Sequence, residues 1–223
     1  MKSLISAFLL IITLMMIGCS GGGTAATSNS GSTVSGVAAT GSPLVGAVYL
    51  KDSSIPAKEL SKAIASDGSF SFDVDGLTKP FILKAVGTSG GVNYTLYTVV
   101  SASGTANINP LSHMAAMAAN SGQDLTVLYD NLTPGTLQAI QALYADALAS
   151  VVAKLKPLFD ASGLSVVDPV GGAYVADHKG LDAVFDLLSF VIHGSDITIL
   201  NRANNAVIYT SGAGAILSQN FRL

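Results

Sequence analysis

The chain has 223 residues, with 11 Lys and Arg against 14 Asp and Glu, and a formal net charge of −3. Charged residues make up 11 % of the chain, whereas soluble domains carry roughly 25 %. Without an excess of basic residues, the composition excludes the electrostatic footprint of a nucleic-acid-binding protein. The length suffices for one large domain or two small ones with real cores.

The first residues have the parts of an export signal. Lys2 is followed by 14 apolar or small residues at positions 4–17, and then by Gly18 and Cys19. A helix of that length reaches roughly 21 Å, which is short of a hydrocarbon layer of about 30 Å. We therefore expect a signal peptide rather than a membrane span. In an ordinary cleaved signal peptide, Cys19 would be incidental.

The stretch Met16-Ile17-Gly18-Cys19 resembles the lipobox of bacterial lipoproteins, in which apolar and small residues precede a cysteine. The resemblance implies a signal peptide over 1–18, cleavage before Cys19 and diacylation of its sulfur. It also implies outer-membrane sorting, because Ser20 follows the cysteine. Since Cys19 is the only cysteine, its lipidation would exclude disulfides, thiol catalysis and cysteine metal sites.

Residues 20–33 consist of Gly, Ser, Thr, Ala and Asn, none of which buries much apolar surface. This composition predicts a flexible tether. Its r.m.s. reach is about 20 Å. Together with the lipidated Cys19, the tether would occupy 19–33.

Residues 34–108 predict a small antiparallel β-sandwich. Short apolar or alternating runs are separated by turn residues such as Asp67-Gly68 and Asp75-Gly76. The strands are expected at 34–39, 44–50, 60–65, 69–74, 81–86, 94–101 and 105–108.

Three stretches within this region resemble the carboxypeptidase-regulatory-like, or transthyretin-like, domain. They are Gly36, the strand Pro43-Leu44-Val45-Gly46-Ala47-Val48-Tyr49-Leu50, and the hairpin Ser66-Asp67-Gly68-Ser69-Phe70-Ser71-Phe72. The resemblance implies the sandwich fold. It implies little chemistry, because such modules are mostly non-catalytic.

Residues 109–223 predict an α-rich domain with a terminal β-hairpin, so the fold class is α+β. Asn109-Pro110 and Thr133-Pro134 are helix-start signals. Helices are expected at 110–119, 125–131, from 134 to a stop or kink at Pro157, and at 179–193 before Gly194. The hairpin is expected to pair 197–201 with 206–210. The apolar stripe of the third helix predicts packing on its neighbours, with an oligomeric coiled coil as the alternative.

Two short motifs resemble functional ones. Gly87–Gly91 matches the Gly-x-Ser-x-Gly nucleophile elbow, but a strand is expected at 94–101 in place of the required helix, so a hairpin turn is favoured. Asp73 and Asp75 resemble part of a calcium loop, but Ile82 stands where a bidentate glutamate belongs. An Asp-Gly turn is the favoured interpretation there, with adventitious calcium binding as the alternative.

The histidines are His113, His178 and His193. We expect His113 to pack inside a helix, His178 to lie in a loop beside Asp177, and His193 to end a helix. None is expected to have a carboxylate at metal-ligand spacing, and a zinc or general-base site would need all three to converge.

These observations predict a lipid-anchored cell-envelope protein with a non-enzymatic binding or structural role. The expected partners are the membrane, through acyl chains on Cys19, and a protein of the envelope. The sequence assigns no catalytic residue, no metal, no cofactor and no ligand; the absence of Trp disfavours a sugar platform. The alternative is an envelope hydrolase whose site lies between the sandwich and the helices.

Overall fold

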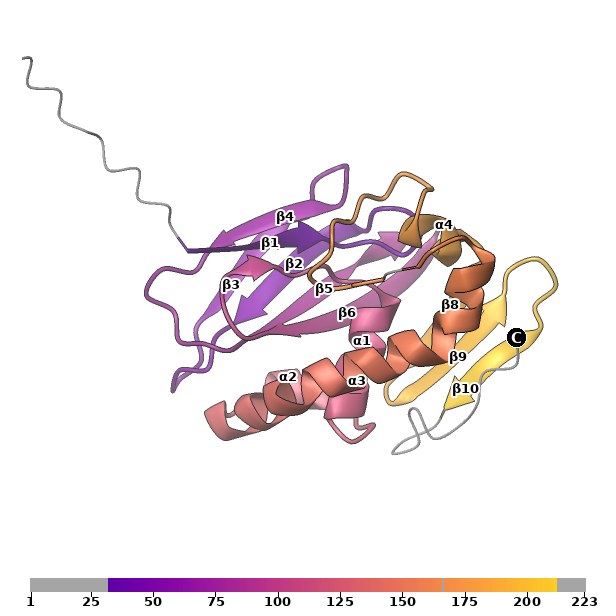
Figure 1. The fold of residues 1–223 in the computed structure, drawn as a ribbon. Coiled ribbons are helices and arrows are strands. Elements are labelled where there is room, and N and C mark those ends of the chain that lie inside the picture. The colour runs from indigo at the N-terminus through magenta and orange to yellow at the C-terminus, as the bar shows by residue number, and fades with distance from the viewer. Residues whose placement is uncertain (1–31, 166, 212–223) are drawn as a thin grey trace, which may run out of the picture. The chain divides into compact units, whose positions relative to one another are not determined.

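The structure is a computed structural model that describes residues 32–165 and 167–211, so Cys19, the lipobox and most of the tether lie outside the described residues. It has a mixed α+β fold (Figure 1). The strands are β1 (Thr33–Val37), β2 (Val45–Lys51), β3 (Glu59–Ala63), β4 (Ser69–Asp73), β5 (Phe81–Ser89), β6 (Val92–Val100), β7 (Gly104–Thr105), β8 (Leu188–His193), β9 (Asp196–Asn201) and β10 (Val207–Ser211). The helices are α1 (Pro110–Ala119), α2 (Leu125–Asp130), α3 (Pro134–Ala161) and α4 (Leu181–Asp186).

The described strands form three sheets. One is antiparallel with four strands in the order β3-β2-β5-β6. A second has the order β4-β1-β7, in which β1 runs antiparallel to β4 and parallel to β7. The third is the antiparallel sheet β10-β9-β8. Residues from all three sheets belong to one hydrophobic core.

Alternating side chains explain the early strands. In β4, Phe70 and Phe72 are buried while Ser71 between them is exposed, as the period-two pattern predicts. The turn before β4 uses Gly68 at φ +85°, a conformation that favours glycine. The six longer strands predicted in this region are confirmed with shifted ends. The seventh is reduced to the two residues of β7, with an isolated bridge at Ile108.

The helices α1 and α3 pack on each other and on β6. The predicted bounds of α1 are confirmed, and Asn109 forms a capping box with Ser112 at its start. In α3 the apolar stripe is buried at Leu137, Ile140, Tyr144, Val151, Leu155 and Phe159. This confirms the predicted packing of the stripe within the chain.

Of the two outcomes predicted at Pro157, a helix end is wrong, because α3 continues to Ala161; a kink there stays a prediction. Leu155 and Phe159 on either side of the proline are buried, and that burial offsets the lost backbone hydrogen bond. Among the described residues, α3 also meets the length and composition criteria for a membrane span, with a mean hydropathy of 1.2. Core helices satisfy the same criteria, and α3 packs on α1 and β6.

The predicted helix over 179–193 is wrong. Only Leu181–Asp186 is helical, and Leu188–His193 forms β8. Leu188, Val191 and Ile192 fit a helical face, whereas Leu188, Phe190 and Ile192 fit period two. Pairing with β9 decides in favour of the strand. Gly194 is therefore the turn between β8 and β9 rather than a helix end, and the predicted terminal hairpin is part of a three-stranded sheet.

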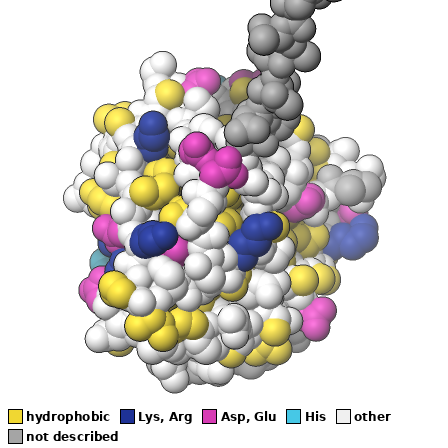
Figure 2. Space-filling view, turned by 90° about the vertical axis from the view of Figure 1, so that its left-hand side faces the viewer, with side chains coloured by type: hydrophobic (Ala, Val, Ile, Leu, Met, Phe, Trp, Pro, Cys, Tyr) yellow, Lys and Arg dark blue, Asp and Glu magenta, His cyan; other side chains and the backbone are white. Residues whose placement is uncertain are grey.

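The surface is mostly uncharged. On the face shown in Figure 2, charged side chains of both signs are scattered among apolar and uncharged polar ones. This agrees with the low charged fraction of 11 %.

Candidate functional site

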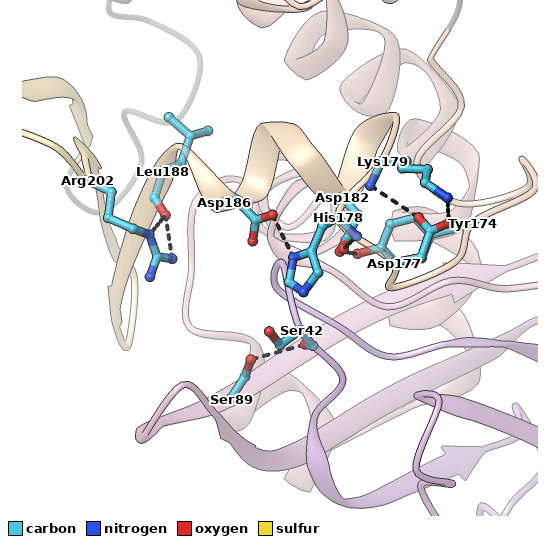
Figure 3. A network of polar contacts seen from close by, with 10 residues as sticks. All are labelled: Ser42, Ser89, Tyr174, Asp177, His178, Lys179, Asp182, Asp186, Leu188 and Arg202. Atoms are coloured by element: carbon cyan, nitrogen blue, oxygen red, sulfur yellow. Dashed lines mark hydrogen bonds and ion pairs between the residues drawn. The ribbon is translucent and has the colours of Figure 1, made fainter.

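The Gly87–Gly91 motif forms the hairpin turn between β5 and β6. Ser89 is buried at the end of β5, and its Oγ donates a hydrogen bond to the backbone oxygen of Ser42 at 3.0 Å (Figure 3). A strand follows the motif, so the hydroxyl is not presented at a helix start as a nucleophile elbow requires. The hairpin interpretation is confirmed.

Asp73 and Asp75 use their carboxylates on backbone N–H groups, Asp73 within its own turn and Asp75 on the residue before β1. Asp73 Oδ1 accepts from the backbone N–H of Asp75 at 3.0 Å, and Asp75 Oδ1 accepts from that of Ser32 at 3.0 Å. Ile82 is fully buried in β5 and offers no oxygen ligand. The Asp73 bond is that of an Asx turn at a strand end, and the Asp75 bond ties this turn to the start of β1.

The three histidines divide between two places. His113 and His193 line the same cavity, whereas His178 lies in the loop before α4. His113 is buried in α1, as expected. The prediction that His193 ends a helix is wrong, because it ends strand β8.

His178, Asp182 and Asp186 form a group that we call the His178 cluster (Figure 3). Each offers one ligand atom, and these atoms all lie within 4.8 Å of one another. His178 Nδ1 is 2.8 Å from Asp186 Oδ2. The expectation that no histidine has carboxylates at metal-ligand spacing is therefore wrong. The interval of four residues was present in the sequence, and the turn into α4 brings the three together.

Hydrogen bonds within the described chain already occupy the carboxylate of Asp182, which is fully buried. Its Oδ1 accepts from the Tyr174 hydroxyl at 2.8 Å, and its Oδ2 accepts from the backbone N–H of His178 at 2.7 Å. Burial and the bond to Asp182 raise the pKa of Tyr174. Asp182 thus fixes the loop between Tyr174 and His178.

His178 and Asp186, the more exposed members of the His178 cluster, form an ion pair. The hydrogen bond and the charge of Asp186 raise the pKa of His178 above its usual value. Asp186 lies against the β1–β2 loop, because a Cβ added at Gly41 would come within 2.7 Å of its Oδ1. Chemically, the pair can hold a proton, and with Asp182 it presents donors of the kind that bind divalent cations.

The second site is a cavity of about 420 Å³, which we call the His113 cavity. This volume lies in the range of small-molecule sites. Strands β5 and β6, helix α1, the start of α2 and the β8–β9 turn contribute to it. Its walls consist of Val86, Gly87, Thr88, Asn93, Tyr94, Thr95, Tyr97, His113, Asp124, Thr126, Ile192, His193 and Gly194.

His113 stands in this wall without a hydrogen-bond partner. It is 2 % exposed, and neither Nδ1 nor Nε2 is hydrogen-bonded within the described chain. Its ring lies 5.8 Å from that of Tyr97, centroid to centroid. Burial lowers the pKa of His113 to about 4, so the ring is neutral at pH 7.

Asp124 is the carboxylate of the cavity. It caps α2, with its Oδ1 accepting from the backbone N–H of Thr126 at 2.7 Å. Its Oδ2 lies next to the β8–β9 turn. A Cβ added at Gly194 in that turn would be 3.3 Å from this oxygen. Tyr97 donates to the Thr126 hydroxyl at 3.3 Å, which joins β6 to the start of α2.

The sequence did not single out Asp124 or Tyr97. Asp124 directly precedes a short helix and has the signature of an N-cap, which is a structural signal. Tyr97 lies in a strand whose residues are buried for packing. Asp124 and Tyr97 come together at one site only because β6, α1 and the start of α2 line the same cavity.

Comparisons with protein families, with curated proteins and with solved structures found no match to the chain.

Proposed function

We propose that the protein is a lipid-anchored component of the bacterial cell envelope with a non-enzymatic binding role. The observation that carries the anchoring is Met16-Ile17-Gly18-Cys19 at the end of a short apolar segment. A single acyl chain binds membranes only marginally, whereas two or more give stable attachment. A diacylated Cys19 supplies them without a transmembrane helix. Ser20 supports attachment to the outer membrane.

We infer further that 34–108 is a carboxypeptidase-regulatory-like sandwich and that 109–223 is an α-rich domain behind it. Support comes from the strands β1 to β7, all of which derive from the first stretch and divide into two sheets. The quoted motifs fall on β2 and on the hairpin into β4. The two stretches are in contact, since β6 of the first packs against α1 and α3 of the second.

The binding role is supported by the His113 cavity. It combines a volume of about 420 Å³ with a carboxylate, several hydroxyl groups and a buried unpartnered histidine. Buried polar groups without partners are rare in folded proteins and cost about 1–3 kcal/mol each. A bound molecule would recover part of that free energy.

Replacing Cys19 by Ala tests the anchor. We expect the variant to lose acyl labelling with a radioactive or clickable palmitate analogue, and to leave the membrane fraction. The matched control is Ser20→Ala, which keeps the modified sulfur and should remain acylated. Retention of Cys19→Ala in membranes at unchanged mobility would refute the proposal.

The second candidate is an envelope hydrolase, and the His178–Asp186 pair favours it. A carboxylate bonded to one histidine nitrogen orients the ring as in hydrolase triads. The pair lies against the β1–β2 loop, at the edge of the inferred sandwich. Ester hydrolysis that is lost in both His178→Ala and Asp186→Ala, but not in Asp146→Asn, would support this candidate. Unchanged hydrolysis in the first two variants would dismiss it.

A further inference from the structure

We propose that the His113 cavity binds a small molecule carrying a protonated amine, with Asp124 as its counter-ion. This deepens the proposed function and rests on its binding role. It does not depend on lipidation of Cys19. Three features of the cavity support it: its charge, its unpartnered histidine and its aromatic walls.

The charge of the cavity selects against anions. Asp124 is its acidic side chain, and no Lys or Arg of the described residues lines it. An anionic ligand would meet a carboxylate of like charge at close range, where the repulsion is poorly screened. An ammonium group would be attracted to the same carboxylate. Only one oxygen of Asp124 is used in capping α2, so its Oδ2 is free of that task.

The histidine supplies a second, independent reason for a ligand. A neutral imidazole has one nitrogen that accepts a hydrogen bond and one that donates. Both nitrogens of His113 lack partners although the ring is in the cavity wall. An ammonium group is a donor without acceptors, so it matches the lone pair of the ring. Both ring nitrogens are buried, so a ligand would give His113 a partner where the side chains around the ring move aside on binding.

The aromatic walls also suit a cation. Tyr94 and Tyr97 both line the cavity, and tyrosine rings attract ammonium groups. The same protein already uses this contact nearby. Lys51 Nζ and Lys84 Nζ lie over the ring of Tyr129, at 4.2 and 4.1 Å from its centroid. Tyr129 itself packs against Tyr97 at 5.8 Å.

Three probes that share a cyclohexyl ring test the charge preference: cyclohexylamine, cyclohexanol and cyclohexanecarboxylate. Each is titrated at pH 7 into the full-length protein in a non-ionic detergent, with calorimetry or amide chemical shifts as the readout. We expect the amine to bind at least ten-fold more tightly than the alcohol, and the carboxylate to bind most weakly. Shifts should centre on β6 and the start of α2.

The variant Asp124→Asn tests the counter-ion. Asparagine keeps the oxygen that caps α2, so the fold should be retained while the charge is lost. We expect amine affinity to fall about ten-fold, with cyclohexanol affinity unchanged. Asp130→Asn at the exposed end of α2 is the matched control and should change neither. His113→Phe keeps a ring beside Tyr97 and should weaken amine binding several-fold.

The outcomes separate the two levels of the proposal. Equal binding of amine and alcohol, or an unchanged amine affinity in Asp124→Asn, overturns the amine inference and leaves the binding role intact. Tighter binding of cyclohexanol, or of glucose added as a polyol probe, than of the amine also overturns the amine inference and leaves the binding role intact. If no probe shifts any resonance of the cavity at millimolar concentration, both the amine inference and the cavity's binding role fail.

Discussion

The two histidines His113 and His178 show opposite ways of placing an imidazole in one protein. His113 is buried at 2 % exposure and has no hydrogen-bond partner in the described chain. His178 is exposed, and its Nδ1 forms a hydrogen bond of 2.8 Å with Oδ2 of Asp186. Burial lowers the pKa of the first, and Asp186 raises the pKa of the second. The surroundings of a histidine, rather than its residue type, therefore decide whether it is neutral or charged near pH 6.5.

The two regions also differ in how they satisfy their polar groups. Around His178, the buried Asp182 uses both oxygens on neighbouring groups. Around His113, the ring nitrogens are unsatisfied beside a cavity. The first arrangement stabilises a loop, and the second leaves interaction free energy available to a ligand.

The largest effect should come from breaking the satisfied region. Asp182→Ala leaves the Tyr174 hydroxyl and the His178 N–H without an acceptor, at roughly 2 kcal/mol each. We expect the free energy of unfolding to fall by about 4 kcal/mol, measured by urea denaturation at pH 7. Asp177→Ala, an exposed neighbour that accepts from Lys179, is the control and should change stability little. A loss equal to that control would mean that the buried network contributes nothing.

The next effect is the pH dependence caused by His113. Its pKa is about 4 when folded and about 6.5 in an unfolded chain, so the unfolded state binds more protons between these values. The free energy of unfolding should therefore rise by about 3 kcal/mol from pH 4 to pH 6.5 and then level off. Parallel denaturation series on His113→Phe should lack this component. Identical pH profiles for the two proteins would show that His113 is not buried in its neutral form.

The smallest effect belongs to the exposed pair. Because the pKa of His178 is raised, its contribution to stability is present below its unfolded pKa and is lost as pH rises through the folded value. The sign is thus opposite to that of His113. An NMR titration should give His178 a pKa above 6.5, and Asp186→Asn should move it down towards 6.5. Asp146→Asn on α3 should leave the titration in place. No shift on removing Asp186 would contradict the ion pair.

Much of the local structure was predictable where one signal dominated. Asn109-Pro110 places the start of α1 because the cap and the proline act within a few residues. Phe70 and Phe72 define a strand by alternation alone. The segment Leu188–His193 was mistaken because its apolar residues fit both periods, and the deciding partner is a strand further along the chain.

The candidate sites were less predictable, because they depend on contacts between distant elements. Asp124, Tyr97 and His113 lie on α2, β6 and α1, and no spacing in the sequence joins them. The His178 cluster was closer to prediction, since its members follow at intervals of four residues. The four-residue intervals from His178 to Asp182 and on to Asp186 were visible in the sequence, and the expectation that no histidine has a carboxylate at ligand spacing overlooked them.

The position of Asp124 limits which residues can stand there. One oxygen of the carboxylate caps the start of α2, and the other lies close to Gly194 in the β8–β9 turn. Ser, Thr and Asn can replace it in the first task but bring no charge, while Glu keeps the charge and caps poorly. A saturation library at this position should therefore separate folding from amine binding, with Asp alone retaining both.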